Sequence, residues 1–205
     1  MKSGEEDWLE DLARARSESN PGARLLAAAR ELFNAQGYQV AGINEIIKRA
    51  GASKKSFYSY YPGKKQLGAA YLRAEANDFA VQLRRRISRY DRDFNGFARS
   101  WAAFLRRQAG KGDFHGCPFA SAAVQAHDDF GELLAELHTE WLALMREYIL
   151  HCKPRIKAHA ADTIARRILL DYQGAVMMWR LSGDLRYFDL LAQSLQDLKM
   201  NSDDV

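Results

Sequence analysis

A run of lysine, serine and tyrosine residues has the side-chain chemistry of a surface that binds phosphate. Its members are Ser53, Lys54, Lys55, Ser56, Tyr58, Tyr60 and Lys64. Lysine supplies positive charge, serine offers a hydroxyl, and tyrosine lays an apolar ring on a sugar while its hydroxyl reaches a phosphate. Residues 46–67 contain no carboxylate. We expect Lys54, Lys55 and Ser56 to lie near base edges, and the other four residues to lie at phosphates.

The flanking residues predict the two short helices that would hold this run. Residues 43–50 have apolar side chains at helical spacing, which indicates an amphipathic helix: Ile43, Ile46, Ile47 and Ala50. Gly51 suits the end of that helix, and Ser53 suits the cap of a second helix that begins at Lys54. Two helices joined by a three-residue turn form a helix-turn-helix. A preceding helix that starts at Asn20-Pro21 would complete a three-helix unit.

The positive charge of the chain is concentrated in this segment. Residues 21–67 contain eight Lys/Arg and two Asp/Glu, which gives this segment a net charge of +6, whereas the whole chain has a net charge of +4. Residues 1–20 contain three and six, a net charge of −3, and residues 68–205 contain nineteen and eighteen, a net charge of +1. A basic segment of this kind favours a polyanion, with an affinity that falls steeply as salt rises.

The rest of the chain is predicted to be helical, so the fold class is all-α. Apolar residues at spacings of three and four predict helices over 64–90, 97–105, 119–127, 130–153, 162–181 and 185–199, and no alternating pattern is long enough for a strand. We predict a DNA-binding head joined to a larger helical domain. The segments are an N-terminal extension at 1–20, the head at 21–66, the larger helical domain at 67–200, and a tail at 201–205.

Composition excludes several classes of protein. No apolar run approaches the roughly 20 residues that cross a bilayer, and the acidic N-terminus does not resemble a signal peptide. The two cysteines, Cys117 and Cys152, fit neither a disulfide framework nor a zinc site. We therefore expect a cytoplasmic protein with no membrane partner, no metal and no cofactor.

At this point the residues match a known pattern. The basic three-helix segment, the run Ala50-Gly51-Ala52-Ser53 and the run from Phe57 to Leu67 (FYSYYPGKKQL) resemble the tetracycline-repressor (TetR) family of bacterial transcriptional regulators. Residues 169–198 resemble the last two, dimer-forming helices of that family. The segment from His115 to Ala120 (HGCPFA) resembles one found in a subgroup that includes LmrA/YxaF-like repressors. Gly42 and Lys55 depart from common family residues, so operator preference cannot be carried over.

The resemblance implies a homodimer that binds a double-stranded DNA operator. A two-fold dimer also has a physical rationale, because one helix-turn-helix reads only a few base pairs. The candidate interface residues on the last two helices are Ile168, Tyr172, Gly174, Val176, Trp179, Leu191, Leu195 and Leu198.

The middle of the chain has enough aromatic surface to line a pocket for a small, largely apolar effector. The candidate residues are Trp101, Phe104, Phe114, Cys117, Phe119, Trp141, Tyr148 and Tyr172. The function expected is a homodimeric repressor that such a ligand releases from its operator, and the protein is not expected to be an enzyme. The alternatives are a ligand-independent DNA-binding adaptor and a thiol enzyme or redox sensor that uses Cys117.

Overall fold

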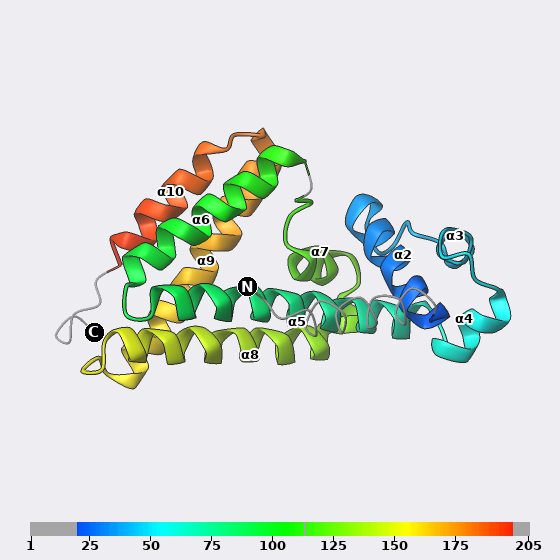
Figure 1. Cartoon of the computed structure of the whole chain (residues 1–205), viewed down its shortest axis with the longest axis horizontal. Helices are drawn as coiled ribbons and strands as arrows, with labels where there is room; N and C mark the ends of the chain where they lie inside the picture. The colour runs from blue at the N-terminus through cyan, green and yellow to red at the C-terminus, as the bar shows by residue number, and fades with distance from the viewer. Residues whose placement is uncertain (1–19, 113, 199–205) are drawn as a thin grey trace, which may run out of the picture. The chain divides into compact units, whose positions relative to one another are not determined.

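The computed structural model describes residues 20–112 and 114–198, and the described part of the chain is all-helical (Figure 1). This confirms the fold class predicted from the sequence. The helices are α2 Pro21–Gln36, α3 Ile43–Arg49, α4 Lys54–Tyr60, α5 Lys64–Tyr90, α6 Phe94–Lys111, α7 Pro118–Gln125, α8 His127–Cys152, α9 Ala158–Ser182 and α10 Arg186–Gln196. The predicted tail at 201–205 and all but the last residue of the predicted extension at 1–20 lie outside the described residues.

Local sequence signals account for the helix ends. The Asn20 side chain accepts a hydrogen bond from the Gly22 amide at 2.8 Å, and Pro21 occupies the first turn of α2, where it loses no helical hydrogen bond. Asp93 caps α6 in the same manner through the Gly96 amide, at 2.8 Å. At the other ends, Gly112 and Gly183 adopt the left-handed conformation that terminates α6 and α9.

The described residues form two compact units, and the first contains residues 20–74 and 122–130. Within its described part, α2 packs against α3 and α4, and the start of α5 completes the core. Leu25, Ile46, Phe57 and Leu67 are fully buried there, one from each of these four helices. This unit corresponds to the predicted DNA-binding head, but it extends beyond residue 66 and includes a second stretch of chain from the end of α7 and the start of α8.

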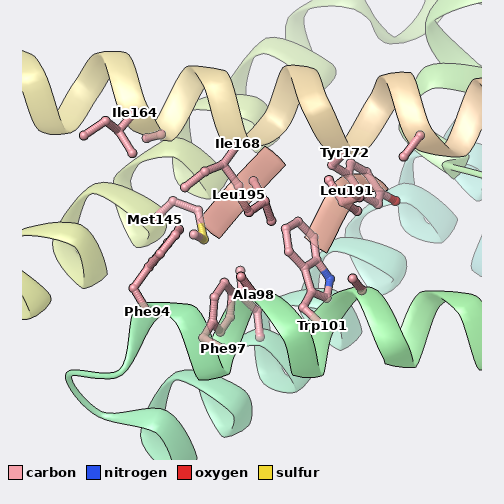
Figure 2. Close-up of a cluster of buried hydrophobic side chains, with 14 of the residues drawn as sticks. Phe94, Phe97, Ala98, Trp101, Met145, Ile164, Ile168, Tyr172, Leu191 and Leu195 are labelled. Atoms are coloured by element: carbon pink, nitrogen blue, oxygen red, sulfur yellow. The ribbon is translucent and has the colours of Figure 1, made fainter. Parts of the chain in front are cut away.

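Among the described residues, the second unit contains 75–112, 114–121 and 131–198, and its core is rich in aromatic side chains. Helix α10 packs against both α6 and α9. Figure 2 shows Ile168 and Tyr172 of α9 facing Phe97 and Trp101 of α6. Each of these four side chains is buried, and Leu191 and Leu195 of α10 join the same cluster.

Within the described residues, none of the helices combines the length and the apolar character needed to cross a membrane.

Candidate nucleic-acid interface

Helix α4 is positioned by a short turn and by a side-chain cap. Gly51 has a φ of 57°, a left-handed conformation that most other residues adopt only at an energetic cost. The Ser53 hydroxyl then accepts a hydrogen bond from the Ser56 amide at 3.0 Å, which satisfies one of the free donors at the start of α4. The sequence predicted both the turn and the cap.

Three contacts fix the two short helices against α2. The Arg24 guanidinium donates to the Ala50 carbonyl at 3.0 Å, where it satisfies a carbonyl at the end of α3. Arg49 forms an ion pair with Glu31 at 3.0 Å. The Tyr61 hydroxyl donates to the Gly22 carbonyl at 3.1 Å, which holds the end of α4 to the start of α2. The first two contacts thus hold α3 against α2, and the third adds to Phe57, the one buried side chain of α4.

Tyr60 packs directly on Gly22. A Cβ atom added at Gly22 would lie 2.5 Å from Cδ1 of the Tyr60 ring, so only glycine fits beneath this ring in its present position. Tyr60 nevertheless remains 47% exposed, so part of the ring faces outward. The ring is therefore held on one side and available on the other.

The predicted DNA-contacting residues differ in exposure. Ser53, Lys54, Lys55, Tyr58 and Tyr60 are exposed, whereas Ser56 and Lys64 are partly buried. Phe57 is fully buried, as its inward position requires. The two sides of α4 thus separate a core anchor from a basic, hydroxyl-rich surface, which is the division that a helix lying in a DNA groove needs.

Lys64 has intramolecular contacts that the sequence did not predict. Its Nζ atom donates to the Gln39 carbonyl at 3.1 Å and lies 4.7 Å from the centroid of the Tyr38 ring. Burial lowers the pKa of Lys64, and the nearby carboxylate of Asp129 acts in the opposite direction. The ammonium group keeps donors beyond the one it gives to Gln39, so its position is compatible with a phosphate contact.

A stretch distant in sequence completes the head. Within the first unit, the Gln125 carbonyl accepts a hydrogen bond from the Gln39 side chain at 2.7 Å, and Phe130 packs edge-on against Tyr38 with ring centroids 4.9 Å apart. Asp129 forms an ion pair with Lys65 at 3.4 Å. Sequence reasoning missed this contact because glutamine and aspartate at a helix junction give no signal of which surface they meet.

The residues predicted to bind a ligand all belong to the hydrophobic core of the second unit or pack against it. Trp101 and Tyr172 stack with ring centroids 5.3 Å apart, and Trp141 joins them through Phe79. The remaining aromatic residues have other neighbours: Phe114 stacks on Trp179, Tyr148 packs against Phe97, Phe104 lies against Arg86, and Phe119 is partly buried at the edge of the core.

Cys117 is buried in the second unit beside Tyr172. Its sulfur accepts a hydrogen bond from the Gln173 side chain at 3.1 Å. Burial, and then the neighbouring Cys117, raise the pKa of Tyr172 well above its ordinary value. His115, the histidine nearest to Cys117 in the sequence, is exposed, whereas Cys117 is buried. Among the described residues, no group of histidine, cysteine and carboxylate side chains could hold a metal ion.

Most of the residues nominated for the dimer interface lie in the core of the second unit. Ile168, Tyr172, Val176, Trp179, Leu191 and Leu195 are all buried, Leu198 is partly buried, and only Gly174 is exposed. These buried side chains pack between the chain's own helices α6, α9 and α10, so a partner could not reach them. An exposed apolar surface lies elsewhere on α9 and α10, formed by Leu170, Met177, Met178, Leu181 and Leu190. We call these five residues, with Gly174, the apolar face.

Comparison with known proteins supports the helix-turn-helix assignment. Residues 25–71 match the model for bacterial regulatory proteins of the tetR family. The chain is 30% identical to the transcriptional regulator LmrA of Bacillus subtilis over 132 residues, which are 60% of this chain and 68% of LmrA. It is 26% identical to an uncharacterized HTH-type transcriptional regulator of Mycobacterium tuberculosis, over 87% of this chain and 93% of that protein.

Solved structures share the fold. A regulatory protein TetR from Rhodobacter sphaeroides has a TM-score of 0.74 at 21% identity, over 84% of this chain and 95% of that one. A TetR-family regulator from Streptomyces coelicolor also has a TM-score of 0.74, at 20% identity, over 87% and 93%. With the exposed basic surface of α4 and the similarity to LmrA, these findings show that the chain is a DNA-binding transcriptional regulator and belongs to the TetR family.

Proposed function

We propose that the protein is a homodimeric repressor that a small, largely apolar ligand releases from its operator. The observation that carries the dimer is the apolar face, where Leu170, Met177 and Leu181 are 66%, 53% and 73% exposed. Residues 170, 177 and 181 lie seven and four apart on α9, so they line one side of the helix. Large apolar side chains exposed along one side of a helix are candidates for contact with a partner.

Gly174 supports a helix-to-helix contact at this face. A Cβ atom added there would meet nothing within 4 Å in the chain, so the chain's own packing does not require glycine. Glycine in a helix interior costs about 1 kcal/mol relative to alanine. Glycine at position 174 would allow the α9 helix of a second copy to approach closely across a two-fold axis, which would explain why a destabilising residue is present here.

The dimer would give the DNA-binding surface its specificity. Two copies of α4 on a two-fold dimer would meet half-sites about one helical turn apart, or a multiple of that distance. Lys54, Lys55 and Ser56 would contact base edges, and Ser53, Tyr58, Tyr60 and Lys64 would contact phosphates. A repressor of this kind occupies an operator with two-fold symmetry and thereby blocks transcription.

Replacement of single lysines would test these roles. We expect Lys64→Ala to weaken binding to all DNA sequences about equally. The slope of log Kd against log salt concentration should fall by about 1, which is the contribution of one phosphate contact. Lys55→Ala would instead change the preferred base at one position of each half-site. Lys153→Ala, at an exposed lysine outside the head, is the matched control. An unchanged salt slope for Lys64→Ala would remove that residue from the phosphate contacts.

The ligand would bind among the aromatic side chains of the second unit. Trp101, Trp141 and Tyr172 supply apolar surface, and the Cys117–Gln173 pair beside Tyr172 supplies polar atoms that could orient a ligand. A mostly apolar lining with a few polar groups is typical of small-molecule sites. A ligand with different affinities for the DNA-bound and free states would shift the equilibrium between them, and typical couplings are about 1–3 kcal/mol.

A screen of hydrophobic compounds would test the ligand. We expect at least one compound to raise the melting temperature and to weaken operator binding, and Trp101→Ala to abolish both effects. Operator binding by Trp101→Ala without compound would show that the variant folds. If no compound in a broad screen changed the melting temperature or the operator affinity, the proposal of a ligand would be rejected. The protein would then be interpreted as a ligand-independent DNA-binding adaptor.

A further inference from the structure

A second candidate site lies in the second unit, in a groove between α6 and α10. Its volume is about 390 Å³, and its wall carries three arginines, Arg99, Arg106 and Arg107. Asp189 is the one carboxylate in the lining, and Leu185 is among the apolar residues that complete it. A volume of this size falls within the roughly 300–1,000 Å³ range of small-molecule sites.

The positive charge of the groove is only partly neutralised. Arg106 forms an ion pair with Asp189 at 3.4 Å, and the Arg99 guanidinium donates to the neutral side chain of Gln196 at 3.2 Å. Arg107 has no ion pair with any residue that the structure describes. One carboxylate therefore faces three guanidinium groups, and two positive charges remain.

A fourth guanidinium strengthens the field at Arg107. Arg86 of α5 is partly buried and lies 3.9 Å from the centroid of the Phe104 ring. Burial, and then repulsion from Arg107, lower the pKa of Arg86. An anion placed near Arg107 would offset this repulsion.

We propose that this groove binds a small amphipathic organic anion, whose carboxylate or phosphate pairs with Arg99 and Arg107 and whose hydrocarbon part lies along the apolar lining at Leu185. Guanidinium groups form the strong, charge-assisted hydrogen bonds that such a head group needs. The apolar part of the lining would gain from covering by hydrocarbon rather than by water.

The groove is separate from the proposed aromatic ligand site and from the apolar face. Its lining includes Asp189 but not Leu190, the α10 residue of the apolar face. Consecutive residues of a helix point about 100° apart, so the two surfaces lie on different sides of α10. The proposal for the groove does not depend on the ligand-induced release of DNA.

Octanoate is a suitable first probe, because it combines a carboxylate with a flexible apolar chain. In an amide chemical-shift titration of the full-length protein, we expect saturable shifts along α6 and α10, with a Kd on the order of 1 mM for a ligand of this size. Octan-1-ol, which keeps the chain without the charge, and acetate, which keeps the charge without the chain, would each bind at least tenfold more weakly. Octyl phosphate would reveal whether a phosphate head group is preferred.

Substitution of the arginines locates the site. The double variant Arg99→Gln/Arg107→Gln should weaken octanoate binding at least tenfold, because each change removes a charge-assisted hydrogen bond. Arg166→Gln, at an exposed arginine of α9 outside the groove, is the control and should bind octanoate as the wild type does. Both variants should retain the wild-type melting temperature to within a few degrees.

Three results would overturn the proposal. The first is octanoate binding that the double variant retains in full. The second is a set of shifts confined to residues around Trp101 and Tyr172, which would place octanoate in the aromatic interior. The third is equal affinity for octan-1-ol, which would show that the arginines do not contribute.

Discussion

The substitution Leu181→Asp tests the apolar face as a dimer interface. Leu181 is 73% exposed in the single chain, and full burial of a leucine side chain is worth about 1.5–3 kcal/mol. Covering the exposed part in a dimer would therefore contribute about 1–2 kcal/mol in each protomer. A two-fold interface contains the residue twice, so its loss would cost about 2–4 kcal/mol. The dissociation constant of the dimer would rise by roughly 30-fold to 1,000-fold.

Sedimentation equilibrium over a range of protein concentrations would measure this change. The matched control is Val81→Asp, which places the same charge at an exposed apolar residue on α5, 47% exposed in the chain. We expect Leu181→Asp to sediment as a monomer at concentrations where the wild type and Val81→Asp are dimers, with unchanged helical content. Wild-type dimerisation by Leu181→Asp, or equal dissociation of Val81→Asp, would refute the assignment of the interface.

Three further outcomes follow from individual contacts. Gly174→Ala should stabilise the isolated chain by about 1 kcal/mol in denaturant unfolding but raise the dissociation constant of the dimer, because the added Cβ is free of contacts only within the chain. Burial and Asp129 raise the pKa of Tyr38 to about 12 in the folded protein, so the neutral Tyr38 side chain stabilises the fold below pH 10 and this contribution is lost as the pH rises towards 12. The variant Tyr38→Phe cannot ionise at this position, so its free energy of unfolding should fall less than that of the wild type between pH 10 and pH 12. Ser53→Ala should destabilise the protein by about 1 kcal/mol in thermal unfolding, because the amide of Ser56 loses its acceptor.

The head was largely predictable because its signals are local. Gly51 and Ser53 are turn and cap residues at adjacent helix ends, and the predicted start of the following helix at Lys54 agrees with the structure. The same holds for α5, whose ends at Lys64 and Tyr90 are those predicted. Asn20 with Pro21 likewise marks the start of α2. Signals of this kind depend only on neighbouring residues, so they can be read without knowledge of the fold.

The exposed side of α9 was not predictable from the same kind of pattern. Helix α9 has apolar residues on several sides, so both Ile168 with Tyr172 and Leu170 with Met177 satisfy a helical spacing. Only the packing of α6 and α10 decides which stripe faces the core. The stripe nominated from the sequence is the buried one, and the exposed stripe carries the proposed contact with a partner.

The sequence also did not reveal the contacts that join the head to residues far along the chain. Gln125 and Gln39 are 86 residues apart, yet two hydrogen bonds of 2.7 and 3.3 Å join them. Neither residue type predicts a partner at that distance. The intramolecular contact of Lys64 with Gln39 belongs to the same group, because it depends on where the loop before α3 is held.

The most direct test of the central claim is selection of bound sequences from random double-stranded DNA. We predict that the wild-type protein enriches an inverted repeat whose half-sites are centred about one helical turn apart, or a multiple of it. Lys55→Ala should enrich a repeat with the same spacing but an altered base at one position of each half-site. Failure to enrich any sequence, or enrichment of a single site without two-fold symmetry, would contradict recognition by two copies of α4 on a dimer.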